Sequence, residues 1–209
     1  MSVSRGLAIE SVDGGDIEDV MISNLTMRNI DNSPIFIRLG SRLRGPDNPP
    51  VGIIRRVNIS NVVVSDAGQN LSSIISGVPG HPVEDVRISN VQIVHRGGGT
   101  ANQAALQPPE KEAAYPEPGM FGTMPAYGFY IRHARSVEFD NVQMKTDKED
   151  FRPAFLLDDV VGANFQNIKY QPPLKDASTF VLGKVEDFNL HQSPLLPDKH
   201  LDQTELQNF

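Results

Sequence analysis

Short stretches of alternating apolar and polar residues recur along the chain, and each is interrupted at one asparagine. Around Asn61, the apolar residues before the asparagine lie at alternate positions, and those after it alternate again, one residue out of phase. Alternation with a period of two predicts a strand with one buried face. The shift predicts a tight corner between two strands, because asparagine tolerates left-handed backbone angles and bonds locally to the chain.

The pattern V-x-I-x-N-V-x-[MIV] occurs in five copies and a degenerate sixth. The spacings of the asparagines fall in or near the range of roughly 20–50 residues that is typical of repeat architectures. A second, shorter apolar strand is expected between copies. The copies are 17–27, 54–64, 83–93, 134–144, 160–170 and 185–195, and the second strands are 34–39, 72–76, 127–132, 154–157 and 179–182.

The repeats predict an all-β protein, a right-handed parallel β-helix (solenoid) of about six coils that forms a single domain over residues 1–209. Equivalent strands of successive coils should pair in parallel, about 4.8 Å apart. The aligned asparagines should form an internal ladder of amide hydrogen bonds. A leucine-rich repeat would need a helix in each unit, and a propeller would need four antiparallel strands in about 40–45 residues. The uneven spacing favours the β-helix, whose corners accept insertions.

The longest insertion, residues 96–126, is rich in glycine and proline and has no strand period. A loop of this length in a compact fold is usually functional or disordered. Its aromatic residues Tyr115 and Phe121, with Tyr127 just after it, indicate that it packs against the rest of the protein. Residues 193–209 are expected to form a C-terminal tail.

Composition narrows the classes of function. The 209 residues suffice for one sizeable core, and 39% hydrophobic residues with 17 glycines and 16 prolines suit many short strands. The absence of cysteine excludes disulfides and thiolate chemistry. A net charge of −7 argues against nucleic acid as a general partner. No apolar run approaches the roughly 20 residues that span a membrane, and the first residues show no signal peptide.

No metal or other cofactor is expected either. The five histidines are scattered and have no spacing typical of metal ligands. Asp13 and Asp16 flank a Gly-Gly turn, which offers too few oxygen ligands for calcium.

The segment 5–11 (RGLAIES), the V-x-I-x-N repeats and the loop 114–122 (AYPEPGMFG) together resemble glycoside hydrolase family 28. This is the polygalacturonase and rhamnogalacturonan hydrolase family, and the resemblance is to its branch in Bacteroidetes. It covers nearly the whole chain. It implies the C-terminal part of a parallel β-helix that hydrolyses galacturonate linkages in pectin with inversion, in an extracellular or periplasmic location. Inversion needs two carboxyl groups roughly 6.5–9.5 Å apart.

The catalytic motifs of that family are not found in this chain. The family has Asn-Thr-Asp and Asp-Asp motifs, followed by Gly-His-Gly and Arg-Ile-Lys. The last should fall at 8–10, where neither cation is present, and the other three should precede it. Two look-alikes, at 158–159 and 80–82, come too late in the chain. We therefore expect a pectic oligo- or polysaccharide as partner, no catalytic residue here, and no activity of the isolated chain.

Four candidate substrate-binding residues could hold the carboxylate of galacturonate. Arg38 and Arg42 lie nearest a strand end in a basic segment, and the planar guanidinium binds carboxylate with two hydrogen bonds. Arg132 and His133 close the strand that follows the long loop, where a histidine could bind the sugar or tune a neighbouring acid. A solvated loop corner for the arginines and a surface turn for the histidine remain open alternatives.

Three further candidates could bind the neutral part of a sugar. Glu10 replaces a cation of the family motif, which would change substrate preference. Tyr115 and Glu117, near Phe121 in the long loop, could line a subsite, since aromatic faces stack on pyranose rings and carboxylates accept hydrogen bonds from hydroxyls. Alternatively, Glu10 is a solvated strand residue and the loop shields a hydrophobic flank.

A second class of function is a non-catalytic β-helix module that binds glycans or acts as a structural spacer. Such a module should cap its first coil, because an open end exposes unpaired backbone and invites aggregation. The sequence shows no amphipathic cap helix before the first expected strand, and this favours a fragment of a larger β-helix over a complete module.

Overall fold

The computed structural model describes residues 5–45, 49–171, 174 and 177–209. Residues 1–4, the start of the segment considered as a leader sequence, lie outside this part. The strands are β1 (Leu7–Ser11), β2 (Ile17–Ile30), β3 (Ile35–Leu39), β4 (Ile54–Ala67), β5 (Ser73–Ser76), β6 (Val83–His95), β7 (Phe129–Thr146), β8 (Phe155–Gln166), β9 (Phe180–His191) and β10 (Lys199–Asn208). Two short helical segments are α1 (Ala101–Ala104) and η1 (Pro118–Phe121).

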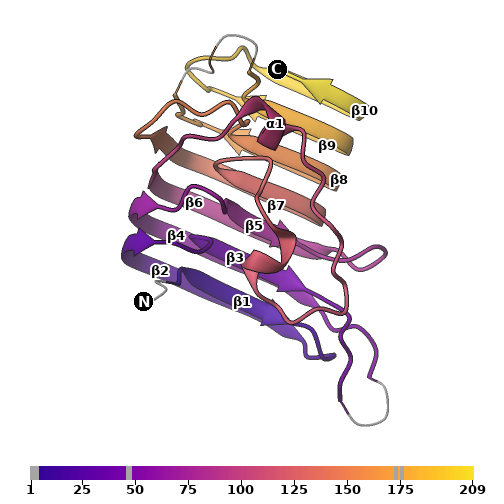
Figure 1. The fold of residues 1–209 in the computed structure, drawn as a ribbon. Coiled ribbons are helices and arrows are strands. Elements are labelled where there is room, and N and C mark those ends of the chain that lie inside the picture. Colours follow the sequence, from indigo (N-terminus) through magenta and orange to yellow (C-terminus); the bar gives the residue numbers. More distant parts are fainter. Residues whose placement is uncertain (1–4, 46–48, 172–173, 175–176) are drawn as a thin grey trace.

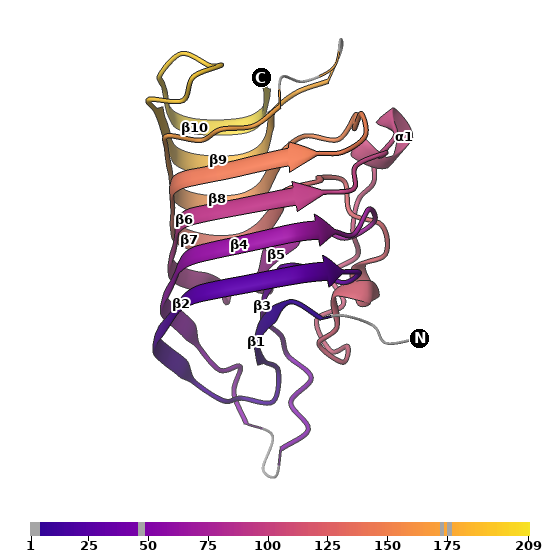
Figure 2. The ribbon, with the colours of Figure 1, turned by 90° about the vertical axis from the view of Figure 1, so that its left-hand side faces the viewer.

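The protein is all-β, with a largely parallel multi-stranded sheet that is consistent with a β-helix-like fold (Figure 1). The repeat strands β2, β4, β6 and β7 pair in parallel in that order, and the shorter strands β1, β3 and β5 pair in parallel and lead to the start of β7. Strands β8 and β9 continue both rows, and Figure 2 shows β2, β4 and β6 side by side. Among the named strands of the described residues, β10, in the segment expected to be a tail, is the one that pairs in antiparallel fashion, with β9.

The predicted corners at the asparagines are confirmed. Asn24, Asn61, Asn90, Asn141 and Asn167 all have left-handed backbone angles, with φ between 52° and 61°. Gln192 occupies the same position in the degenerate sixth copy, with φ of 52°. In each copy the inward-facing residues change phase at this position, and in the first four copies one continuous strand turns there from one face to the next.

The asparagine ladder exists, but it lies on the outside. Each Nδ2 donates to the Oδ1 of the asparagine one repeat earlier, over 2.9–3.2 Å. The expectation of an internal ladder is therefore wrong. Where the backbone turns through a left-handed residue, the apolar side chains on both sides of the corner point inward and the corner side chain points outward.

A second left-handed corner lies five residues before each asparagine. It falls at Asp19, Arg56, Asp85 and Ser136 in the first four copies, with φ between 52° and 57°. Because these residue types differ, the sequence gives no common signal for this corner. β6 therefore consists of three straight segments, and β2, β4 and β7 have a further left-handed residue, at Asn29, Asp66 and His133.

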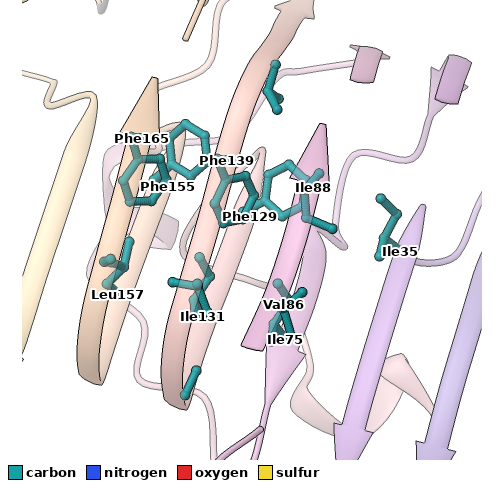
Figure 3. Close-up of a cluster of buried hydrophobic side chains, with 14 of the residues drawn as sticks. Ile35, Ile75, Val86, Ile88, Phe129, Ile131, Phe139, Phe155, Leu157 and Phe165 are labelled. Carbon is teal, nitrogen blue, oxygen red and sulfur yellow. The ribbon is translucent and has the colours of Figure 1, made fainter. Parts of the chain in front are cut away.

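The core fills the space between the rows of strands (Figure 3). Inward-facing aliphatic residues dominate at the β1–β2 end, and phenylalanines dominate toward the C-terminus. One column stacks Phe129, Phe155, Phe180 and Phe209, with ring centres 4.8–5.7 Å apart. A second column, Phe139, Phe165 and Phe188, packs edge-on against the first. Together they hold β7, β8 and β9 in one register.

Most of the long insertion lies across the outer face of the shorter strands, and we call residues 105–126 the strap (Figure 1). Phe121 and Met124 of the strap pack on Phe36, Ile74 and Tyr130. The loop is therefore packed, as its aromatic residues indicate. Neither helical segment in the described residues is long and apolar enough to cross a bilayer.

Candidate functional site

Three predicted site residues occupy equivalent positions on neighbouring strands. The strand registers align Glu10 with Arg38, Arg38 with Ser76, and Ser76 with Arg132. The next strand continues this row with Asp158. Since the residue directly before each row position belongs to the core, the row faces away from the core, toward the strap.

Arg38 lies beneath the strap and is 1% exposed. Its Nη1 donates to Ser76 Oγ and to the Gly77 carbonyl, both at 2.8 Å. Its Nη2 donates to the strap carbonyls of Glu110 and Lys111, at 3.1 and 3.3 Å. Burial, and to a lesser extent the like charge of Arg132, lowers the pKa of Arg38 to about 10. Arg38 therefore remains charged at neutral pH and fastens the strap to β3 and β5.

Arg132 fastens the same part of the strap from β7. Its Nη1 and Nη2 donate to the carbonyls of Pro108 and Pro109, at 2.9 and 3.0 Å, and Nη1 lies 3.1 Å from Glu110 Oε1. Phe121 lies against both guanidinium groups, 5.3 Å from Arg38 and 5.8 Å from Arg132. Burial leaves neither arginine free to grip a sugar carboxylate in this conformation.

His133 bridges two acidic side chains at the edge of the strap. Its Nδ1 lies 2.5 Å from Asp159 Oδ2, and its Nε2 lies 3.1 Å from Glu110 Oε2. The histidine is 9% exposed, whereas the Asp159 side chain is 55% exposed. Next to this cluster, burial raises the pKa of Asp158, and the positive charges of Arg132 and His133 oppose the shift.

The other predicted residues meet in a hollow beside β1. Glu10 reaches it from the strand, and Tyr115 and Glu117 reach it from the strap more than a hundred residues later. The hollow has a volume of about 110 Å³, and its polar lining residues are Arg5, Glu10, Asn32, Ser33, Tyr115 and Glu117. The structure therefore brings together three candidates that are far apart in the sequence. The sequence suggested each of them only because its residue type suits sugar binding.

The electrostatics of the hollow are mixed. Partial burial raises the pKa of Glu10, Arg5 acts in the opposite direction, and the negative charge of Glu117 adds to the rise. Tyr115 is 66% exposed and offers an open ring face. The site can thus accept hydrogen bonds from hydroxyl groups, provide a cation, and stack on an apolar sugar face.

Arg42 does not line this hollow but lies beside Tyr115, which does. Its guanidinium is 5.5 Å from the centre of the Tyr115 ring. Nε donates to Asp13 Oδ1 at 3.0 Å, and Nη2 pairs with Oδ2. The hydrogen bonds from Arg42 and from the Arg44 amide lower the pKa of Asp13 to about 2. Arg42 therefore keeps Tyr115 near the hollow, while part of its donor capacity is used by Asp13.

A larger cavity of about 340 Å³ lies elsewhere, and Tyr127, Thr146, Asp150 and Arg152 contribute to its lining. None of the predicted site residues lines it. Asp150 and Arg152 form a buried ion pair, and each side-chain oxygen and nitrogen of the pair has a hydrogen-bond partner, in the other side chain or in the backbone of Gly99, Met124 and Arg152. Behind it, burial lowers the pKa of His95 to about 3, so this histidine is neutral.

Sequence reasoning missed Arg5, Glu110 and Asp159. Asp159 follows the row residue Asp158, just as His133 follows Arg132, and both have left-handed φ values of 57° and 50°. The alignment of the repeats could therefore have predicted that His133 and Asp159 lie side by side. Residues 158–159 were interpreted only as a displaced catalytic motif. The other look-alike, at 80–82, forms an exposed turn in which Val78 pairs with His81.

Comparisons with known proteins leave this geometry as the main guide to function. No family model matches the chain, no curated protein is similar to it, and no solved structure matches its fold.

Proposed function

We propose that the chain forms a right-handed parallel β-helix of about six coils and binds a galacturonate-containing pectic saccharide beside its first strand. The parallel registers between equivalent segments and the asparagine ladder support the solenoid. The convergence of Glu10, Tyr115 and Glu117 in one hollow carries the binding proposal.

The groups in the hollow suit an acidic sugar. The exposed Tyr115 ring stacks on the apolar face of a pyranose, and Glu10 and Glu117 accept hydrogen bonds from its hydroxyls. Arg5, in the lining, and Arg42, beside Tyr115, attract the uronate carboxylate. Burial raises the pKa of Glu10, the positive charge of Arg5 opposes this rise, and the negative charge of Glu117 adds to it.

We further propose that the chain belongs to a hydrolase of the glycoside hydrolase family 28 type, acting outside the cytoplasm, in an extracellular or periplasmic location. The resemblance of the repeats, the first strand and the loop 114–122 supports this assignment. The catalytic aspartates would lie outside these 209 residues, next to the hollow at the β1 end. Glu10, Tyr115 and Glu117 would then form a subsite beside the cleavage point.

A non-catalytic glycan-binding or structural module is the second candidate. The observation that favours it is the strap, which covers the outer faces of β3, β5 and β7 and fixes Arg38 and Arg132 beneath it. A polymer-cleaving enzyme needs an open groove, and the strap covers this part of the outer face.

Replacing Tyr115 with alanine is expected to weaken binding of oligogalacturonides about 5–10-fold, because stacking contributes about 1 kcal/mol. Tyr115→Phe keeps the ring and should bind within about twofold of the unmodified chain. Isothermal titration calorimetry with oligogalacturonides measures both. Phe151→Ala, at a 42% exposed aromatic residue that does not line the hollow, is the matched control. Equal affinities for Tyr115→Ala and the unmodified chain would contradict the site.

The purified 209-residue chain is expected to show no hydrolysis of polygalacturonate or rhamnogalacturonan, because the family's acid–base aspartates are absent from it. A reducing-sugar assay with prolonged incubation measures this. Turnover that disappears in Asp158→Asn or Asp159→Asn would instead place the acid–base pair beside His133.

A further inference from the structure

The β1–β2 end of the sheet presents free strand edges. In the part of the chain that the structure describes, β1 pairs only with β3 and β2 only with β4. An unpaired edge offers backbone donors and acceptors that can template another strand. Figures 1 and 2 both place these strands at the end opposite β9 and β10.

The apolar interior is also open at this end. The inward-facing residues of β2 are only half-buried, whereas their register partners on β4 are 0–1% exposed. The half-buried residues are Val20, Ile22, Leu25 and Met27, and their partners are Val57, Ile59, Val62 and Val64. The side chains of β4 are buried because β2 covers them on one side and β6 on the other. A further layer placed on β2 would bury its four side chains in the same way.

The asparagine ladder is directional, and this restricts what such a layer can be. Asn24 Oδ1 accepts from Asn61 Nδ2 at 3.1 Å, but among the described residues Asn24 Nδ2 has no acceptor. In the four observed steps, the acceptor is always the asparagine Oδ1 of the adjacent parallel repeat. The next acceptor would therefore be the corner amide of a further parallel repeat.

A second copy of this chain does not supply that repeat. Two β2 edges related by a twofold axis run antiparallel, whereas all four observed steps of the ladder join parallel repeats. At the other end, β10 is antiparallel and has no residue with positive φ, so it does not follow the path of β2, which turns at Asp19, Asn24 and Asn29. Phe209 also stacks there on Phe180, with ring centres 5.3 Å apart, and covers that end of the core.

We propose that the β1–β2 face docks a parallel β-repeat segment with the pattern V-x-I-x-N-V-x-V, whose asparagine continues the ladder at Asn24. The partner is a polypeptide segment that carries this repeat and pairs in parallel with β2. This inference rests on strand edges, core exposure and the ladder, and it does not depend on saccharide binding.

A fluorescent peptide with the sequence of 54–67 (IRRVNISNVVVSDA) serves as the probe, and fluorescence anisotropy measures its binding to the intact chain. Hydrogen exchange is expected to show new protection in 17–30 and not in 199–208. A peptide in which the asparagine equivalent to Asn61 is alanine should bind about 3–10-fold more weakly. Asn24→Ala in the chain should cause a similar loss, and the two changes together should cost little more than either alone.

A matched pair of variants separates docking from general stickiness. Ile22→Lys places a charge in the open interior and should abolish peptide binding, whereas Met21→Lys, at a 74% exposed outward position, should leave it unchanged. Thermal unfolding checks that both variants are folded. If the 54–67 peptide and its alanine variant bind equally well, the asparagine ladder does not contribute to docking, and that result would overturn the proposal. Protection of 17–30 by the chain alone, with a dimer mass by light scattering, would identify a second copy as the occupant and overturn the proposal.

Discussion

Replacing Asp150 with alanine is expected to lower the free energy of unfolding by about 3–5 kcal/mol, because it leaves a buried arginine without its counter-charge. The Arg152 side chain is 2% exposed and that of Asp150 is fully buried. Asp150 accepts from Arg152 Nε at 2.9 Å and from Nη2 at 2.7 Å, and also from the Gly99 amide at 3.0 Å. Urea denaturation followed by circular dichroism measures the change.

Two further variants test the cause of this loss. Asp147→Ala removes an exposed acid three residues away and should change stability by less than about 0.5 kcal/mol. The double variant Asp150→Ala with Arg152→Met removes both charges and should be more stable than Asp150→Ala alone. If the double variant is no more stable, the unpaired charge is not the source of the loss.

This ion pair also explains how the long insertion is held. Arg152 Nη1 donates to the Met124 carbonyl at 3.3 Å, and Asp150 holds the Gly99 amide, so one pair binds both ends of the insertion. A side-chain carbon on Gly99 would lie 2.1 Å from Arg152 Nε, so only glycine fits there. Between these ends, Arg38 and Arg132 hold the strap at 108–111. The buried arginines thus fix the loop that carries Tyr115 and Glu117 to the hollow.

The repeats could be predicted from sequence because their signals are local. Alternation of apolar residues and its reset at an asparagine are visible within eleven residues, and they gave the strands and one corner. The second corner, at Asp19, Arg56, Asp85 and Ser136, could not be predicted, because several residue types tolerate that backbone there. The asparagine ladder points outward because the side chain of a left-handed corner residue points away from the core. This direction could not be predicted from the sequence either.

The sequence predicted which residue types could bind a sugar, but it could not predict which of these residues lie together in the structure. Glu10, Tyr115 and Glu117 share one hollow because the strap crosses the sheet, and an aperiodic loop carries no signal about which face it covers. Arg38 and Arg132 were therefore assigned from residue type and strand position alone. Their burial results from carbonyl groups of 108–111 that approach them from the distant loop.

Phe155→Ala is expected to destabilise the protein by about 3–5 kcal/mol, because a large buried side chain is removed from a closely packed column. Phe155 is 0% exposed and stacks on Phe180 and Phe129, with ring centres 4.8 and 5.7 Å away. It also packs edge-on against Phe139 and Phe165, so its loss opens a cavity between both phenylalanine columns. Urea denaturation measures the loss of stability.

The same substitution four residues earlier gives the matched control for Phe155→Ala. Phe151 is 42% exposed, and Phe151→Ala should cost less than about 1 kcal/mol. A one-residue slip of β8 would turn its apolar residues outward, and the phenylalanine columns oppose it by aligning Phe155 with both neighbouring strands. Hydrogen exchange in Phe155→Ala should therefore increase first in β8 and β9, while β2 and β4 keep the protection they have in the unmodified chain. Equal loss of protection in all strands would mean that the repeats unfold as one cooperative unit and not from the phenylalanine-rich end.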